Sequence, residues 1–385
     1  MTGERLRPQH IQHRRVVVKV GSNVLTAGSD RLDTRTMAGL VDQIAALIER
    51  GGEVVLVSSG AIAAGRQRVG TPAANSALKA RGVHSRQVLA AIGQSRLMAL
   101  WDTMFDQAQI VIAQALLTRA DIADRLRYLN ARNTLMGLIE IGVVPIVNEN
   151  DVVSVEELST STIGDNDNLS AQVANLIDAD LLLILTDIDG LYTADPARDP
   201  HARLIERVER VDAAIERAAR GAPGARGTGG MLTKVQAARI ATQSGTHVVL
   251  ARGAAEDVVL RAAAGEPVGT HFLPTGDRLE SRLRYLLSGL QMRGRIEVDA
   301  GAARALMQGG KSLLPAGVTG STGEYRRGDV VQVVTADGQA LARGTVNYAS
   351  GEVARILGKH SDQIVGILGY EYGEEIVHRN NLVIV

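Results

Sequence analysis

Residues 15–23 read RVVVKVGSN, a β-branched run that leads into a lysine, a glycine and two small polar residues. We expect the run to form a strand, and Gly21 to let the backbone approach a polyphosphate closely and direct N–H groups at its oxygens. A second glycine-rich segment, GTGGMLTK at 227–234, ends on Lys234 just before a helical pattern. Lys19 and Lys234 would supply the positive charge that a transferring phosphoryl group needs. Phosphoryl transfer is therefore the first function that the sequence indicates.

From Arg15 to about Leu273, short β-branched runs alternate with longer helical patterns. The predicted strands are Val16–Val20, Val54–Ser58, Ile110–Leu116, Val143–Asn148, Leu181–Thr186 and His247–Ala251. The predicted helices are Thr34–Arg50, Arg86–Phe105, Asp121–Glu140, Leu169–Ile177 and Met231–Gln243. Apolar strands that alternate with helices predict an α/β fold, an open and mostly parallel sheet with helices on both faces.

Small, polar or acidic residues follow the predicted strands: GS at 21–22, SSGA at 58–61, NEND at 148–151 and TDIDG at 186–190. Ligands of such sheets bind beyond the carboxyl ends of the strands, so these residues would open onto one crevice. A fifth cluster, GDNDN at 164–168, precedes the helix predicted from Leu169, where Asp167 or Asn168 could serve as its N-cap. Capping explains one such residue, but it does not explain five polar clusters at successive junctions.

The composition limits the class of protein. A chain of 385 residues holds two or three domains with their own cores. Its 42 Lys+Arg balance 42 Asp+Glu, so the broad basic field of a general nucleic-acid binder is missing. The absence of cysteine excludes disulfides, a thiol nucleophile and a cysteine-ligated metal. No apolar run reaches the roughly 20 residues of a membrane span, and residues 1–14 are polar rather than signal-like, which predicts a soluble cytoplasmic protein.

The best-known nucleotide-binding motifs are missing. The sequence has no G-x-x-x-x-G-K-[ST], no G-x-G-x-x-G after a strand, and no kinase H-R-D and D-F-G pair. Taken alone, Lys19 could be a solvated lysine at a strand end, and Lys234 an ordinary lysine of a first helical turn. The helix dipole disfavours a positive charge at that end, so an anionic ligand beside the glycines explains Lys234 better.

Segments spread along nearly the whole chain point to a known family. They read KVGSNVL (19–25), SSGAIAAGR (58–66), AIGQSRL (91–97), LTRAD (117–121), LNAR (129–132), VNEND (147–151), GDNDNLS (164–170), TDIDGLYTADP (186–196) and GTGGMLTK (227–234). In this order they resemble the glutamate 5-kinases of the amino-acid kinase superfamily. The chain departs from the family at Ser22-Asn23, where Thr-Ser is common, and in a longer polar stretch at 73–85. Neither departure touches the two lysines or the Asn-Asp motif.

The resemblance implies a role for individual residues. Lys19, Lys234 and Asp167 would be catalytic, with the two lysines beside the phosphates and Asp167 holding both ammonium groups. L-Glutamate would be bound by Ser59, Asp151 and Asn166, with Asp151 opposite the α-ammonium. ATP would be bound by Lys19, Gly21, Thr186, Asp187, Thr228, Gly229, Gly230, Met231, Leu232, Thr233 and Lys234. Mg²⁺ would accompany ATP, with no direct protein ligand assigned.

The chemistry agrees with this division of roles. The γ-carboxylate of glutamate has a reference pKa of about 4.3, so it is ionised at neutral pH and needs no general base. The enzyme must bring two anions together and neutralise the charge on the phosphoryl oxygens. The product would be γ-glutamyl 5-phosphate, the first intermediate of proline biosynthesis. The family further implies feedback inhibition by proline and a homo-oligomer, either a dimer or a tetramer.

The C-terminal part is glycine-punctuated and predicted to be rich in strands. Candidate segments include GRIEV at 294–298, Leu313–Gly317, Tyr325–Asp329, Val330–Val334 and Ala342–Val346, and Asp337-Gly338 is a hairpin signal. LLPAGV at 313–318 and YRRGD at 325–329 resemble the PUA domain of many glutamate 5-kinases. The expected division is a catalytic domain at 15–273, a linker at 274–289 and a PUA-like, mostly-β domain at 290–385.

Two alternatives to glutamate phosphorylation stay open. PUA domains elsewhere bind RNA, so the chain could be an RNA-binding protein. Residues 290–385 nevertheless carry equal numbers of basic and acidic side chains, without the excess that drives binding to a phosphate backbone. The chain could also be another superfamily member, such as an acetylglutamate, aspartate or uridylate kinase, which the C-terminal part and the GDNDN cluster disfavour.

Overall fold

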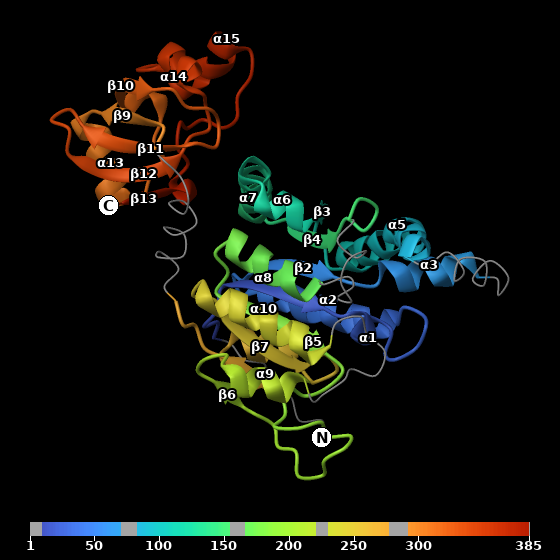
Figure 1. Ribbon diagram of the computed structural model, residues 1–385. Coiled ribbons are helices and arrows are strands. Elements are labelled where there is room, and N and C mark those ends of the chain that lie inside the picture. The colour runs from blue at the N-terminus through green and yellow to red at the C-terminus, as the bar shows by residue number, and fades with distance from the viewer. Residues whose placement is uncertain (1–9, 71–82, 155–165, 221–229, 277–291, 385) are drawn as a thin grey trace. The chain divides into compact units, whose positions relative to one another are not determined.

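The computed structural model describes residues 10–70, 83–154, 166–220, 230–276 and 292–384 (Figure 1). The chain divides into two compact units, Met1–Asp277 and Arg278–Val385. The exact end of the catalytic domain at 273 and the start of the PUA-like domain at 290 stay predictions. Most of the expected linker and of the polar stretch 73–85 lies outside the described residues.

An eight-stranded sheet forms the centre of the first unit, in the order β3-β4-β2-β1-β5-β7-β8-β6 (Figure 1). Its strands are β1 (Arg15–Val20), β2 (Glu53–Ser58), β3 (Ile112–Leu117), β4 (Val144–Glu149), β5 (Leu181–Thr186), β6 (Arg207–Val208), β7 (His247–Arg252) and β8 (Thr270–Phe272). β1 pairs in parallel with β2 on one side and with β5 on the other. The direction changes at β8, which runs antiparallel to β7. The mostly parallel sheet confirms the predicted fold class.

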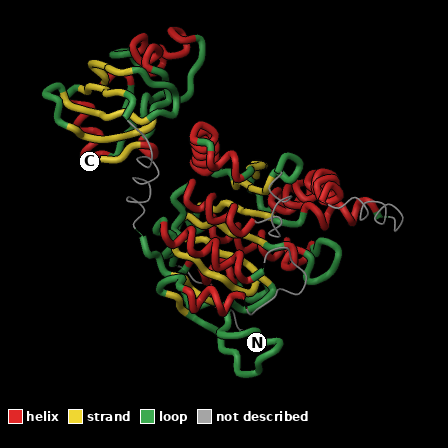
Figure 2. Tube along the Cα trace, viewed as in Figure 1, coloured by secondary structure: helices red, strands yellow, loops and turns green. Residues whose placement is uncertain are grey.

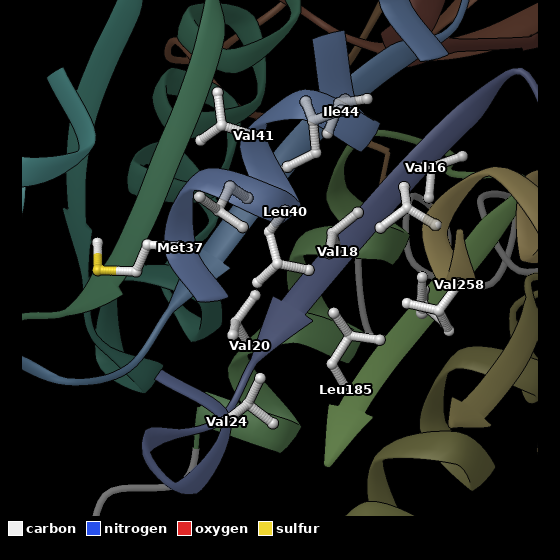
Figure 3. Close-up of a cluster of buried hydrophobic side chains, with 14 of the residues drawn as sticks. Val16, Val18, Val20, Val24, Met37, Leu40, Val41, Ile44, Leu185 and Val258 are labelled. Carbon is white, nitrogen blue, oxygen red and sulfur yellow. The ribbon is translucent and has the colours of Figure 1, made fainter. Parts of the chain in front are cut away.

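Successive residues of β1 enter two different cores. Val16, Val18 and Val20 pack with helix α2 (Thr34–Glu49), as Figure 3 shows, whereas Val17 belongs to a second core. Helices cover both faces of the sheet, so almost every position of the central strands is buried and apolar. Besides α2, the helices of this unit are α1 (Ser22–Leu25), α3 (Ala61–Val69), α5 (Val83–Gln107), α6 (Arg119–Ala123), α7 (Arg125–Glu140), α8 (Asn166–Leu176), α9 (Ala213–Arg220), α10 (Met231–Gln243) and α11 (Val258–Ala263).

The helix predicted at Arg86–Phe105 extends over Val83–Gln107 as α5, and two further predicted helices differ from the prediction. The helix predicted at 121–140 breaks into α6 and α7 because the Asp124 carboxylate caps α7, accepting the Arg127 N–H at 2.9 Å. Helix α8 begins at Asn166, so the suggestion that Asp167 or Asn168 caps a helix starting at Leu169 was wrong. Both residues lie within its first turn, which leaves the Asp167 carboxylate available to other partners.

The second unit contains a five-stranded sheet in the order β10-β9-β11-β12-β13. The strands of this sheet are among those drawn in yellow in Figure 2. Its strands are β9 (Gly294–Val298), β10 (Val318–Gly323), β11 (Val330–Thr335), β12 (Ala340–Thr345) and β13 (Leu382–Ile384), and its α-helices are α13 (Ala300–Gly309), α14 (Ser350–Ile356) and α15 (Ile364–Leu368). β11 and β12 are antiparallel on either side of the predicted turn, where Gly338 has φ +82°.

Two expected strand segments of this unit are not strands. Pro315–Gly317 forms a short 3₁₀ helix, since Pro315 opens it, and Tyr325 lies in a loop with its ring buried in the core. The three α-helices that the structure describes between residues 292 and 384 were not predicted. Throughout the described residues of the chain, no helix is both long and apolar enough to cross a membrane.

Candidate active site

The polar residues after β1, β2, β4 and β5 meet at one edge of the sheet because these strands are parallel and lie side by side. The backbone N–H of Ser59 donates to the Val20 carbonyl at 3.1 Å and joins the ends of β1 and β2. A Cβ added to Gly21 would lie 3.6 Å from the Lys19 Nζ. Gly21 therefore keeps the space beside the lysine ammonium open.

Lys19, Asp167 and Lys234 form a buried ionic cluster at this edge. The Lys19 Nζ donates to Asp167 Oδ1 in a very short contact, and the Lys234 Nζ donates to Oδ2 at 3.1 Å. The Thr233 hydroxyl also donates to Oδ2, at 2.7 Å. Only 1% of Asp167, 5% of Lys19 and 9% of Lys234 is exposed. The structure thus brings together two lysines 215 positions apart, as expected from the sequence.

The cluster keeps its charges although it is buried. Burial by itself would raise the pKa of Asp167, but the two lysine ammonium groups and the hydrogen bonds from Lys19 and Thr233 hold that pKa far below its usual range. One carboxylate against two ammonium groups leaves net positive charge in the cluster. Such a site suits a ligand that brings negative charge.

Three amide side chains and a serine form a second polar network beside it. The Asn166 Nδ2 donates to the Ser59 Oγ and to the Asn148 Oδ1, both at 3.0 Å. The Asn148 Nδ2 in turn donates to the Gln94 Oε1 at 2.8 Å. Asn148 and Asn166 are buried, and the Asn166 Oδ1 has no hydrogen-bond partner among the described residues.

The single tryptophan of the chain donates a hydrogen bond to Ser58, the residue before Ser59. Trp101 is fully buried, and its indole N–H donates to the Ser58 Oγ at 3.0 Å. The Ser58 hydroxyl donates to the Ser59 carbonyl at 2.9 Å. Helix α5 therefore supports the Ser59 turn through a polar contact inside an otherwise apolar core.

The remaining expected residues lie around the same edge. The exposed Asp187 accepts hydrogen bonds from the Thr186 hydroxyl at 3.0 Å and from the Asn23 Nδ2 at 2.9 Å. Gly230 is the N-cap residue of α10, whose first residues Met231, Leu232, Thr233 and Lys234 lead into the ionic cluster. Asp151 is half-buried in the turn that follows β4. Thr228 and Gly229 lie outside the described residues.

Several residues of the site were missed by the sequence analysis. Gln94 and Asn148 lay in motifs quoted there, yet neither received a role. Arg252, the last residue of β7, pairs with both oxygens of Asp189 at 2.6 and 3.1 Å, and Tyr192 donates to the same carboxylate. Within the described residues, no three His, Cys, Asp or Glu side chains come together as a metal site.

Comparison with known proteins identifies the family of the chain. The amino acid kinase family model matches residues 14–252, and the PUA domain model matches residues 294–368. A glutamate 5-kinase from Dehalococcoides mccartyi is 50% identical over 373 residues, which is 97% of this chain and 99% of that protein. This chain belongs to the amino acid kinase family, among its glutamate 5-kinases.

Two further glutamate 5-kinases support the same assignment. The glutamate 5-kinase of Herpetosiphon aurantiacus is 51% identical over 96% of this chain and 98% of its own length, and that of Vibrio vulnificus is 47% identical over 97% of each. The solved UMP kinase of Bacillus anthracis is more distant, with a TM-score of 0.45 and 15% identity over 69% of this chain and 97% of that one. Family membership makes the chain a kinase and implies ATP as its phosphoryl donor.

Proposed function

We propose that this chain transfers the γ-phosphoryl group of ATP to the γ-carboxylate of L-glutamate and forms γ-glutamyl 5-phosphate for proline biosynthesis. The observation that carries the proposal is the buried Lys19–Asp167–Lys234 cluster at the carboxyl ends of the parallel strands. The relatives named glutamate 5-kinase, similar over almost the full length, support the choice of acceptor.

In this proposal the two lysines carry the catalytic charge. The γ-carboxylate attacks in its ionised form, so the site needs no general base. Lys19 and Lys234 offset the charge on the phosphoryl oxygens as the bond to the leaving oxygen breaks. Asp167 does not accept a proton, because its pKa is held far below neutral pH. Its role is to fix both ammonium groups, and Thr233 fixes the carboxylate.

The amide network forms the proposed glutamate pocket. Ser59 and Asn166 are joined by a 3.0 Å hydrogen bond and lie next to the ionic cluster through the neighbouring Asp167. The Asn166 Oδ1 is an acceptor, and Asp151 brings a carboxylate after β4. An acceptor and a negative charge suit the α-ammonium of an amino acid.

Magnesium is proposed as the companion of ATP. Both oxygens of Asp167 already accept from Lys19, Lys234 and Thr233, so this carboxylate is not offered as a ligand. Mg²⁺ commonly keeps its waters and binds mainly through substrate phosphates, and the residues of this site fit an ion that arrives in that way. The ion would draw charge from the phosphate oxygens.

The remaining parts of the proposal concern regulation and assembly. Proline as a feedback inhibitor, a dimer or tetramer, and a cytoplasmic location stay predictions. The assigned residues all fall in the first unit, so the second unit is proposed to have no part in the chemistry. RNA is not proposed as its partner, because residues 290–385 carry equal numbers of basic and acidic side chains.

Trapping the product with hydroxylamine tests the function. The full chain with ATP and Mg²⁺ should form a hydroxamate with L-glutamate and little or none with N-acetylglutamate or aspartate as acceptor, and it should release little or no ADP with UMP, which is followed by ADP release because its product is not an acyl phosphate. A preference for any of these other acceptors would contradict the proposal.

A further inference from the structure

The orientation of the buried amide groups can be worked out from fixed donors. The backbone N–H of Glu149 donates to the Asn148 Oδ1 at 2.9 Å, and a backbone N–H can only donate. The oxygen of the Asn148 amide is therefore fixed, and its Nδ2 faces Gln94. That Nδ2 is buried and must donate, and the Gln94 Oε1 accepts from it at 2.8 Å.

The fixed Asn148 oxygen in turn sets the orientation of the Asn166 side-chain amide. The Asn148 Oδ1 accepts a second hydrogen bond at 3.0 Å, and this bond must come from the Asn166 Nδ2. The other N–H of that group faces the Ser59 Oγ at 3.0 Å. Both Asn166 donors are thereby used, and its Oδ1 is left as a buried acceptor with no partner in the described part of the chain. An unpaired buried acceptor is costly, and a donor supplied by a ligand beside Ser59 would relieve that cost.

We infer that Gln94 is a positioning residue which, through Asn148, holds the Asn166 amide with its oxygen toward the α-ammonium of the substrate. This inference rests on the proposed function, since it names the group that the Asn166 oxygen receives. Gln94 lies on α5 and acts only through the two asparagines. Without its Oε1, the buried Asn148 Nδ2 loses its acceptor, and an Asn148 amide that turns to find another would pull the Asn166 amide with it.

Two substitutions separate hydrogen bonding from shape. Gln94→Met keeps the length of the side chain and removes the acceptor, whereas Gln94→Glu keeps an acceptor at the same place. We expect Gln94→Met to raise both the Kd of L-glutamate, measured by calorimetry, and its KM by about tenfold, the scale of one lost buried hydrogen bond. The kcat and the KM for ATP should stay within about twofold. Gln94→Glu should stay within about threefold of the wild type. The matched control is Gln107→Met, at an exposed position of the same helix.

Glutarate, which is glutamate without its α-amino group, provides the decisive comparison. If Gln94 positions an acceptor for the ammonium, Gln94→Met should weaken the binding of L-glutamate and leave the inhibition constant of glutarate unchanged. Equal weakening of both ligands would mean that Gln94 only shapes the pocket and would overturn the inference. An unchanged Kd for L-glutamate in Gln94→Met, or equal losses in the Met and Glu variants, would also overturn it.

The proposed function is judged separately in the same experiment. If the wild-type chain neither binds L-glutamate nor forms its hydroxamate, the proposed function fails, and the inference about Gln94 fails with it. If the wild type is active and the Gln94 variants behave as the control does, only the inference about Gln94 fails.

Discussion

The two ends of the central sheet hold ionisable groups in opposite charge states, fully buried at one end and half-buried at the other. At the carboxyl ends of the strands, Asp167 stays charged between Lys19 and Lys234. At the other end, His271 of β8 and His247 of β7 are in contact through ring nitrogens 3.1 Å apart, and His13 packs on His247 with ring centroids 4.8 Å apart. Burial, His247 and Arg207 lower the pKa of His271 to about 4.

The partners outweigh the depth of burial, because the more deeply buried Asp167 is the group that stays charged. Burial opposes the charged form at both ends, since it raises the pKa of Asp167 and lowers that of His271. Asp167 meets two opposite charges that outweigh this cost. The charges that act on His271 are of the same sign as its own protonated form, so it stays neutral. A fold can thus keep a charged site at one end of its strands and a neutral one at the other.

The largest effect should come from removing the charge between the lysines. Asp167→Asn keeps the shape but removes the carboxylate that both buried ammonium groups contact. Breaking a buried ion pair from one side costs about 3–5 kcal/mol, so the free energy of unfolding should fall by that order, and hydroxamate formation should be lost. Urea unfolding of the variant, with Asp106→Asn at an exposed position as the control, measures the first effect. A variant as stable as the control would mean that the lysines do not need this carboxylate.

The next effect concerns the lysines one at a time. Lys19→Ala and Lys234→Ala each leave Asp167 one ammonium partner, so the fold should survive. Each should lower kcat by about 10²-fold or more, the scale of losing one donor to the charge of a transition state. Steady-state kinetics beside the exposed Arg35→Ala variant would show this. A near-normal kcat in either lysine variant would return that lysine to a structural role.

A smaller effect is expected at Asp151, which is only half-buried at the same end of the sheet. Water screens its charge, so it should contribute less than the ionic cluster. We expect Asp151→Asn to raise the KM for L-glutamate by about tenfold, on the order of one charge-assisted hydrogen bond, and to leave the KM for ATP unchanged. If the two constants rise together, Asp151 does not face the α-ammonium.

The smallest effect is expected from His271, as a change of stability with pH. His271 has a lowered pKa of about 4 against the ordinary 6.5, so the unfolded chain binds more protons between these values. The contribution of His271 to the free energy of unfolding is complete above pH 6.5 and is lost as the pH falls toward about 4. After allowance for screening, the free energy of unfolding should fall by on the order of 1 kcal/mol over that range. His271→Gln should flatten this pH dependence and His201→Gln, at an exposed position, should not; identical profiles for the two variants would refute the prediction.

The sequence predicts the fold of the first unit well because its strands are buried on both faces. β5 and helix α10 have the predicted ends, and β1 differs by one residue. Short elements such as α1 and α3 escaped prediction, since four to nine residues with few apolar positions carry little periodic signal. In the second unit, helix α14 was missed for the same reason.

The site was predicted unevenly. Lys19 lies near the end of β1, Ser59 follows β2, and Lys234 and Asn166 come after glycines. The structure brings the two lysines together on Asp167 and joins Ser59 to Asn166, and the roles given to these residues stay predictions. The role of Asp167 came from the resemblance, while the local pattern alone also suggested a cap. Gln94 could not be found by its neighbours in sequence, because its partner Asn148 is 54 positions away and on another element. Residues that act through a side-chain contact leave no local pattern.

The support of the Ser59 turn by Trp101 has an optical consequence. All the tryptophan emission of the chain arises from this one indole, whose N–H is bonded to Ser58. The second unit contributes none. The tryptophan fluorescence of the unlabelled native chain would therefore report on changes next to the proposed glutamate pocket during a titration with L-glutamate.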